Sequence, residues 1–285
     1  MPEGDTVWLA ALRMRAALAG RTLTHADLRV PRQANTDLCG HDVVDVIARG
    51  KHMLTRLSSD LTLHSHFLMD GSWRIGRSGA PWRGGPGHTV RAVLANEQWQ
   101  ALGYQLHDIA VLPTSEETTL VGHLGPDVLG PDWDARHAAA NLRGDPARPI
   151  GEALLDQRNL AGLGTVYESE TLFLCRISPW TPVGDVDAID DVVATAHRLL
   201  NANRQHPEQS TTGSRRRGEE HWVYARRRLP CRRCGSAVRC ARIGAAPNDR
   251  VAYWCPSCQH GPAPAVDPGP SRSSAHRRPH RGRTP

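Results

Sequence analysis

The feature that most constrains the fold lies near the C-terminal end of the chain, where cysteines stand in the order Cys231-x2-Cys234 and Cys255-x2-Cys258. Two such pairs on facing turns can place four thiolates tetrahedrally, about 2.3 Å from a Zn²⁺ ion. Four sulfur ligands fill the coordination shell and leave no position for a substrate. The spacing therefore predicts one structural Zn²⁺, and the alternative is two redox-active cysteine pairs.

The charge of the chain is distributed unevenly. Residues 210–285 hold 16 arginines against 4 acidic residues, a net charge of +12, which leaves about −6 for residues 1–209. Guanidinium groups match the geometry of phosphates, so a basic third on an acidic body favours a nucleic-acid partner. A solvated basic tail would give the same count.

One basic residue differs from all the others. The chain has 35 lysines and arginines, and Lys51 is the single lysine among them. A lysine can lose its proton and relay one, which an arginine cannot do. Lys51 is therefore a candidate for proton transfer, although a sole lysine can also arise by chance.

The chain opens with the residues "MPEGDTVW". Removal of Met1 would make Pro2 a secondary α-amine, and α-amino groups have a pKa of about 7.7–8.0. An unprotonated amine can attack an electrophilic carbon and form an iminium ion, with Glu3 beside it as an acid or base. The other interpretation is that Pro2 is an ordinary second residue.

Hydrophobic periodicity predicts a β-rich N-terminal part and a helical middle part. A helical pattern over residues 5–19 is followed by short β runs, which are typical of a β-sandwich or barrel. The β runs cover residues 21–30, 42–49, 52–57, 61–68, 72–76, 89–95 and 101–106. The helical patterns that follow cover residues 135–143, 149–164, 165–176 and 185–205.

Nothing in the chain approaches the run of about 18 apolar residues that a membrane span needs. The first residues also lack the cationic and apolar regions of a secretory leader. We therefore expect no membrane partner and a cytoplasmic, nucleoid-associated protein. One site on one chain would suffice, so we expect a monomer.

Six segments in order resemble the formamidopyrimidine-DNA glycosylase and endonuclease VIII family, and the opening and "MDGSW" resemble its bacterial endonuclease VIII branch. The segments are "MPEGDTVW", "RGKHML" (49–54), "LTLHSHFLMDGSW" (61–73), "HLGPDVL" (123–129), "LLDQRNLAGLGTVYESETLF" (154–173) and "RVAYWCPSCQ" (250–259).

The resemblance implies a multidomain α+β fold. We expect an N-terminal catalytic β-sandwich domain with a flanking helix, a linker, a helix-two-turn-helix DNA-binding domain with a base-covering loop (211–224), a four-cysteine zinc-finger hairpin and a disordered basic tail. The expected bounds are 1–122, 123–134, 135–225, 226–261 and 262–285 in that order.

The resemblance also implies a bifunctional DNA glycosylase and abasic-site lyase. By resemblance, Pro2 attacks C1′ of the damaged nucleotide and forms a Schiff base, and β,δ-elimination then cuts the strand. Glu3 would be the acid that assists base release or sugar opening, Lys51 would aid proton transfer, and Arg250 would bind the phosphate beside the lesion. The implied partner is double-stranded DNA with oxidised bases, above all pyrimidines, or abasic sites, and also single-stranded or bubble DNA.

Four further residues fall on DNA-contacting positions of the family. Leu68 and Met69 would fill the gap left by an everted base, although Met69 could instead be a core residue at a strand end. Thr165 stands where the family usually has Asn, so we expect weaker binding of the DNA backbone. His123 stands where some relatives have a phosphate-binding arginine, and it is either a weaker contact or a linker residue.

Two other functions compete with this one. A non-catalytic relative that binds damaged DNA would need to lose Pro2, Glu3 or Lys51, and all three are present. An N-terminal-proline tautomerase would be small and would need no zinc finger.

Overall fold

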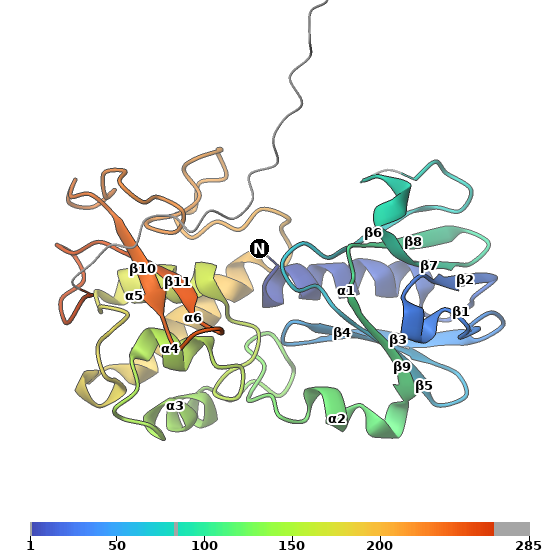
Figure 1. The fold of residues 1–285 in the computed structure, drawn as a ribbon, viewed down its shortest axis with the longest axis horizontal. Coiled ribbons are helices and arrows are strands. Elements are labelled where there is room, and N and C mark those ends of the chain that lie inside the picture. The colour runs from blue at the N-terminus through green and yellow to red at the C-terminus, as the bar shows by residue number, and fades with distance from the viewer. Residues whose placement is uncertain (1, 83–84, 265–285) are drawn as a thin grey trace, which may run out of the picture.

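The computed structural model describes residues 2–82 and 85–264. Figure 1 shows a β-sandwich on the right, helices and a β-hairpin on the left, and the N-terminus between them. The predicted basic tail therefore lies outside the described residues from position 265 onward. Among the described residues, no helix is long and apolar enough to cross a membrane.

The first helix, α1 (Gly4–Leu18), runs along the sandwich and supplies part of its core. Its buried residues recur at helical spacing, so one face packs on the sheets. The residues of α1 in this core are Val7, Ala11, Met14, Ala17 and Leu18. Because α1 begins at Gly4, its rigid N-terminal end fixes the position of Pro2 and Glu3.

Two antiparallel sheets enclose the core of the N-terminal domain. The first sheet has the order β1 (Arg21–Thr22), β3 (Asp42–Arg49), β4 (His52–Leu57), β5 (Leu61–His66) and β9 (Asp108–Pro113). The second has the order β2 (His25–Leu28), β7 (Val90–Ala95), β8 (Trp99–Tyr104) and β6 (Ser72–Arg77). The predicted sandwich is thus confirmed.

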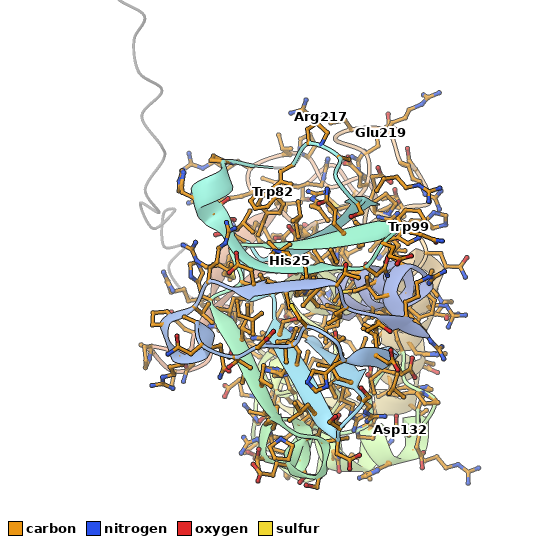
Figure 2. All side chains as sticks on the ribbon, turned by 90° about the vertical axis from the view of Figure 1, so that its right-hand side faces the viewer. His25, Trp82, Trp99, Asp132, Arg217 and Glu219 are labelled. Carbon is orange, nitrogen blue, oxygen red and sulfur yellow. The ribbon has the colours of Figure 1, made fainter. Side chains whose placement is uncertain are left out.

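Two strand predictions in this domain were wrong. The run at 21–30 is not one strand, because the chain changes sheets at the buried Leu23: β1 pairs with β3, and β2 pairs with β7. The strand β9 was not predicted, and it closes the first sheet against β5. Figure 2 views the sandwich from outside and labels Trp99 on β8. The guanidinium carbon of Arg77 on β6 lies 4.1 Å from the centre of the Trp99 ring.

The helical domain packs around α5 (Thr165–Cys175), in which residues 165–173 are all buried. A helix buried on every side is a central core element. The surrounding helices are α3 (Ala135–Arg143), α4 (Ile150–Leu155) and α6 (Ile189–Asn203), and α2 (Thr118–Val121) precedes them. Short 3-10 helices cover Pro31–Gln33, Gly87–Thr89, Thr114–Glu116 and Val183–Asp185.

The helix predicted over 149–164 is shorter than expected. It ends at Leu155, and a nine-residue turn leads to α5. Gly162 in this turn has φ +101°, a left-handed conformation that suits glycine and not a helix. This turn brings the backbone of residue 162 against Gly4, whose amide donates to the Gly162 carbonyl at 2.8 Å.

The C-terminal hairpin consists of β10 (Arg239–Ile243) and β11 (Arg250–Trp254). It rests on α5, because the Tyr253 amide donates to the Ser169 hydroxyl at 3.1 Å. Arg250, the first residue of β11, therefore has its position set by α5.

Residues 123–134 connect the two domains and form no helix or strand, but hydrogen bonds and an ion pair hold them in place. The buried carboxylate of Asp127 accepts a hydrogen bond from the Gly50 amide at 2.7 Å. Arg49 forms an ion pair with Asp132 at 3.0 Å and also donates to the Gly125 carbonyl. These contacts fix the β3–β4 turn, which carries Lys51, to the helical domain.

Candidate active site

A cleft with a volume of about 870 Å³ separates the sandwich from the helical domain and the hairpin. It brings together residues that are far apart in the sequence. The predicted site residues that line it are Pro2, Lys51, Leu68, Met69, His123, Thr165 and Arg250. Because both domains contribute, the cleft exists only in the folded two-domain arrangement.

Glu3 is fully buried beneath the cleft. Its carboxylate accepts hydrogen bonds from the Gly164 amide at 2.8 Å and the Val166 amide at 2.7 Å, so it caps the N-terminus of α5 from another domain. Burial raises the pKa of Glu3 to about 7, against the opposing effects of Lys51 and the two amides. Glu3 can therefore hold or release a proton near neutral pH.

Lys51 lies in the turn between β3 and β4, directly after Gly50, which has φ +58°. Removal from water lowers the pKa of Lys51, and Arg250 adds to this effect, whereas Glu3 opposes it. A lysine in these surroundings loses its proton more easily than one in water.

Gly164 allows the close approach of these two ionisable groups. A Cβ atom at this position would lie 2.7 Å from the Glu3 carboxyl carbon and 2.9 Å from the Lys51 Nζ atom. Both distances are shorter than any van der Waals contact, so only glycine leaves room here. Thr165 follows as the first residue of α5 and is buried at the wall of the cleft.

The residues after β5 point apolar side chains into solvent at the rim. Met69 is 58% exposed and Leu68 is 45% exposed, and Leu68 has φ +50°. The core interpretation of Met69 is thus excluded. His123 is also exposed at the cleft.

Arg250 reaches the cleft from the start of β11. Its guanidinium donates to the carbonyls of Asn248 at 2.9 Å and Asp249 at 3.2 Å. These two neutral acceptors hold the side chain without cancelling its charge, so it can still bind an anion.

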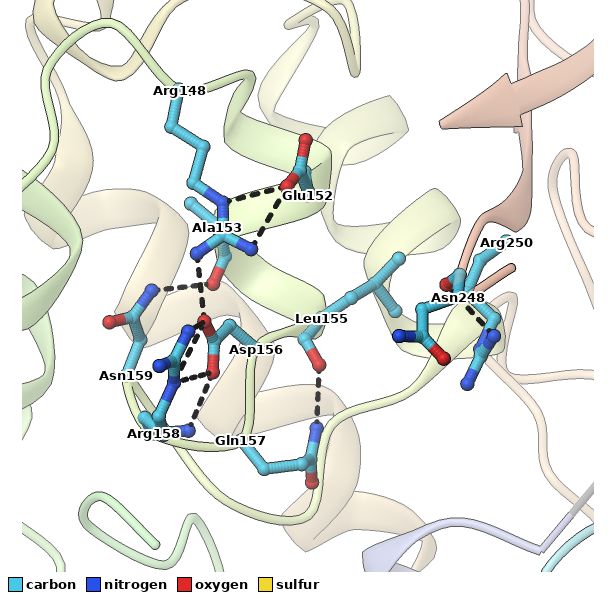
Figure 3. A network of polar contacts seen from close by, with 10 residues as sticks. All are labelled: Arg148, Glu152, Ala153, Leu155, Asp156, Gln157, Arg158, Asn159, Asn248 and Arg250. Atoms are coloured by element: carbon cyan, nitrogen blue, oxygen red, sulfur yellow. Dashed lines mark hydrogen bonds and ion pairs between the residues drawn. The ribbon is translucent and has the colours of Figure 1, made fainter. Parts of the chain in front are cut away.

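A polar network that was not predicted from the sequence lies on the wall formed by α4 and the turn after it (Figure 3). Asp156 accepts from Arg148 at 2.8 Å and from Arg158 at 2.6 Å, and these contacts hold the pKa of Asp156 well below its usual range. Arg158 remains exposed at the cleft. Arg158 lies within the segment 154–173, and its charge close to Gly162 and Gly164 could have identified it from the sequence.

Sequence analysis also missed a group of imidazoles next to Lys51. His52 and His66 line the cleft and stack at 4.5 Å, and His52 Nδ1 lies 2.8 Å from His64 Nε2. Burial lowers the pKa of His52 to about 3, so this ring is neutral at neutral pH. The alternation of His64 and His66 in one strand did not reveal their pairing with His52 on the neighbouring strand.

The four predicted zinc ligands converge in the C-terminal module. The sulfur atoms of Cys231, Cys234, Cys255 and Cys258 all lie within 4.8 Å of one another. Two Sγ–Sγ distances are 3.9 Å and 3.4 Å, close to the edge of about 3.8 Å of a tetrahedron with Zn–S bonds of about 2.3 Å. The donor set and its geometry thus fit a metal ion.

Segment 207–224 is fastened to both neighbouring modules. The buried carboxylate of Glu170 on α5 accepts from the amides of Trp222, Val223 and Tyr224, each at 2.8 Å. Side chains of Arg226 and Arg232 in the zinc module donate to the Gly218 carbonyl. None of the residues that line the cleft comes from this segment among the described residues.

Comparison with known proteins agrees with this architecture. The formamidopyrimidine-DNA glycosylase N-terminal domain matches residues 1–125, and the formamidopyrimidine-DNA glycosylase H2TH domain matches residues 124–209. A "Probable endonuclease 8 2" of Streptomyces coelicolor is 54% identical over 93% of this chain and 96% of its own length. A "DNA-(apurinic or apyrimidinic site) lyase Nei2" of Mycolicibacterium smegmatis is 46% identical over 91% of this chain and 99% of its own length.

A solved structure has the same fold at low sequence identity. The formamidopyrimidine-DNA glycosylase of Lactococcus lactis, bound non-covalently to DNA with an abasic site, superposes with a TM-score of 0.74 at 22% identity. The match covers 91% of this chain and 100% of that protein. The matched domains and relatives show that the chain belongs to the formamidopyrimidine-DNA glycosylase and endonuclease 8 family.

Proposed function

We propose that this protein is a bifunctional DNA glycosylase and abasic-site lyase of base excision repair, with Pro2 as the nucleophile. The observation that carries the proposal is the meeting of three groups at one point: Pro2 and Lys51 line the cleft, and Glu3 lies beneath it at the N-terminus of α5. The names of the relatives from S. coelicolor and M. smegmatis support this activity.

In the first step, the unprotonated Pro2 amine attacks C1′ of the damaged nucleotide. The glycosidic bond breaks, its electron pair leaves with the base, and opening of the sugar ring gives an iminium ion between the Pro2 nitrogen and C1′. Glu3 supplies the proton for base release or ring opening. Its pKa of about 7 keeps a useful fraction protonated at neutral pH.

The iminium ion then makes the 2′ hydrogens acidic. Loss of a 2′ proton, assisted by Lys51, expels the 3′ phosphate, and a second elimination expels the 5′ phosphate. The lowered pKa of Lys51 suits it to this transfer. Arg250 binds the phosphate beside the lesion and favours its departure as an anion.

The proposed substrate is double-stranded DNA with an oxidised base, above all a pyrimidine, or an abasic site. The target nucleotide must leave the stack to reach Pro2, and the exposed Met69 and Leu68 are suited to fill the gap. Thr165 and His123 would contact the backbone, and Thr165 offers a single hydroxyl where the family usually has an amide. Single-stranded and bubble DNA would fit the same cleft.

We assign one structural Zn²⁺ to Cys231, Cys234, Cys255 and Cys258, on the basis of their geometry. A zinc ion with four thiolate ligands supplies folding energy and takes no part in the chemistry. Its role is to hold the hairpin that carries Arg250.

The second candidate function is binding of damaged DNA without cleavage. Thr165 is the observation that favours it, because a weaker hold on the DNA backbone would slow the chemistry. The presence of Pro2, Glu3 and Lys51 at one point argues against it.

Borohydride trapping on DNA with an abasic site, and then with dihydrouracil, tests the proposal. Wild type should give a covalent adduct, and Pro2→Gly should not, once mass spectrometry confirms that Met1 is absent. Lys51→Arg keeps the charge but not the transferable proton, so it should slow elimination as Lys51→Ala does. Absence of the adduct from zinc-loaded wild type that still binds the DNA would overturn the enzymatic proposal in favour of the second candidate.

A further inference from the structure

Asp5 is a buried carboxylate in the first turn of α1, two residues after Glu3. The steps proposed above give it no role. It does not line the cleft, and it is 1% exposed, so substrate cannot touch it.

Three elements meet at this carboxylate. The Tyr167 hydroxyl of α5 donates to Oδ2 at 2.6 Å, and the Gln209 amide, from the segment after α6, donates to Oδ1 at 2.9 Å. Thr6 adds a longer contact from α1 itself, at 3.4 Å. Burial raises the pKa of Asp5, and the hydrogen bonds from Tyr167 and Gln209 oppose this effect because they favour the ionised carboxylate.

We propose that Asp5 is a positioning residue of the reaction: its carboxylate fixes the N-terminal turn of α1, and with it Pro2 and Glu3, to α5 and to the segment after α6. This inference rests on the function proposed for Pro2 and Glu3. The contacts that connect Glu3 with Asp5 pass through one turn of a helix. Glu3 binds the first turn of α5, and Tyr167 extends from that same turn back to Asp5.

Asp5 also acts on Glu3 through its charge. Burial raises the pKa of Glu3 most strongly, and Lys51 lowers it. The negative charge of Asp5 raises it by a smaller amount. The charged and titratable groups that face Glu3 and Lys51 from the packed elements are Asp5, His52, His66, Tyr167, Glu168, Tyr224 and Arg250. Removing the Asp5 charge therefore makes Glu3 a stronger acid that loses its proton at lower pH.

A structural role alone is the competing explanation, because an acidic residue in the first turn stabilises a helix. Two variants separate the explanations. Tyr167→Phe removes one donor and no ionisable carboxyl group, whereas Asp5→Asn removes the carboxylate and keeps the shape. Asp27→Asn, on the partly exposed Asp27 of β2 that pairs with Arg29, is the matched control.

The experiment measures the single-turnover rate of base release at saturating DNA from pH 5.5 to 9, together with DNA affinity. Tyr167→Phe should lower the rate at every pH by about tenfold with unchanged affinity, because small displacements of a nucleophile are costly. Asp5→Asn should in addition move the alkaline limb of the profile to lower pH, by about half a unit or more. The pH titration of Glu3 in the free protein, followed by the ¹³C chemical shift of its carboxyl carbon, should move in the same direction.

Rates within twofold of wild type at each pH, with an unmoved Glu3 titration, would overturn the role of Asp5 and leave the proposed function intact. A lower rate in both Tyr167→Phe and Asp5→Asn, with an unmoved alkaline limb and an unmoved Glu3 titration, would assign Asp5 to helix stability alone. Absence of base release and of a borohydride adduct in wild type would instead overturn the proposed function itself, and the role of Asp5 with it. Asp27→Asn should match wild type throughout.

Discussion

At the scale of single residues, Gly164 sets how closely the two ionisable groups beneath the cleft can approach. We expect Gly164→Ala to lower lyase activity by about 100-fold or more, because displacement of catalytic groups by about 1 Å is that costly. The new methyl group would displace Glu3 or Lys51. Gly76→Ala is the matched control, since a Cβ at Gly76 meets nothing within 4 Å. Equal rates of strand cleavage by the two variants on DNA with an abasic site would contradict the prediction.

Glu168 on α5 offers a second prediction, on stability. It is fully buried, its Oε1 atom has no hydrogen-bond partner, and burial raises its pKa to about 8. Between pH 4.5 and pH 8 the unfolded chain therefore binds fewer protons at this group than the folded chain, and stability falls as pH rises. Below pH 4.5 the group is neutral in both states, so the cost disappears.

We expect Glu168→Gln to remove this pH dependence. The gain in unfolding free energy over wild type should grow between pH 5 and pH 8 by at most about 1.4 kcal/mol per unit. Urea unfolding at several pH values measures it, with the exposed Glu97→Gln as control. A difference between variant and wild type that stays constant with pH would show that Glu168 is ionised in the folded protein.

Some of these residues were predicted from the sequence and others were not, for a physical reason. Pro2, Glu3 and Lys51 carry unusual chemistry at recognisable places, so their residue types were enough to single them out. The significance of Asp5 and Glu168 depends on burial and on partners more than 100 positions away, or on a missing partner. Nothing in the local sequence distinguishes them from solvated acids.

At the scale of elements, the zinc module and segment 207–224 form one mechanical unit. Two arginines of the zinc module bind the Gly218 carbonyl, and Glu170 binds the backbone at 222–224. Removal of zinc by a chelator should therefore increase hydrogen exchange across 211–224 and leave the β4–β5 pair unchanged. Protection of 211–224 that survives chelation would show that Glu170 holds the segment alone.

The elements themselves were predicted best where one periodicity runs without interruption. The helix at 135–143 matches α3, and β3 and β4 match their predicted bounds. The errors at 21–30 and 149–164 fall where tertiary contacts decide: a change of sheet at Leu23, and a turn that brings Gly162 against Gly4. Local patterns carry no information about either contact.

At the scale of the whole molecule, Asp127 joins the two domains beneath Lys51. Its buried carboxylate accepts from the amides of Gly50 and Leu129. Asp127→Asn would set an amide group against one of these donors, which should cost about 1–3 kcal/mol in unfolding free energy. Asp132→Asn is the control, because Asp132 is 57% exposed in its pair with Arg49 and should cost less than about 1 kcal/mol.

Urea unfolding measures both costs, and the rate of strand cleavage at an abasic site reports whether Lys51 remains in place. Equal losses in the two variants would contradict the assignment of the interdomain contact to Asp127. Slower strand cleavage by Asp127→Asn under conditions where the protein is folded would connect the contact between domains to the chemistry.

The capping of α5 by Glu3 also determines when, during translation, the site can come into existence. Residues 2 and 3 are synthesised long before the amides that bind the Glu3 carboxylate, which lie 161 and 163 positions later. At about 5–20 residues per second, roughly 8–30 seconds pass between the two events. Through that interval the nascent N-terminus is accessible to the enzyme that removes Met1, and Glu3 lacks the burial that raises its pKa. Pro2 is made early, and the carboxylate proposed to assist it reaches its hydrogen-bond partners only when the second domain has folded.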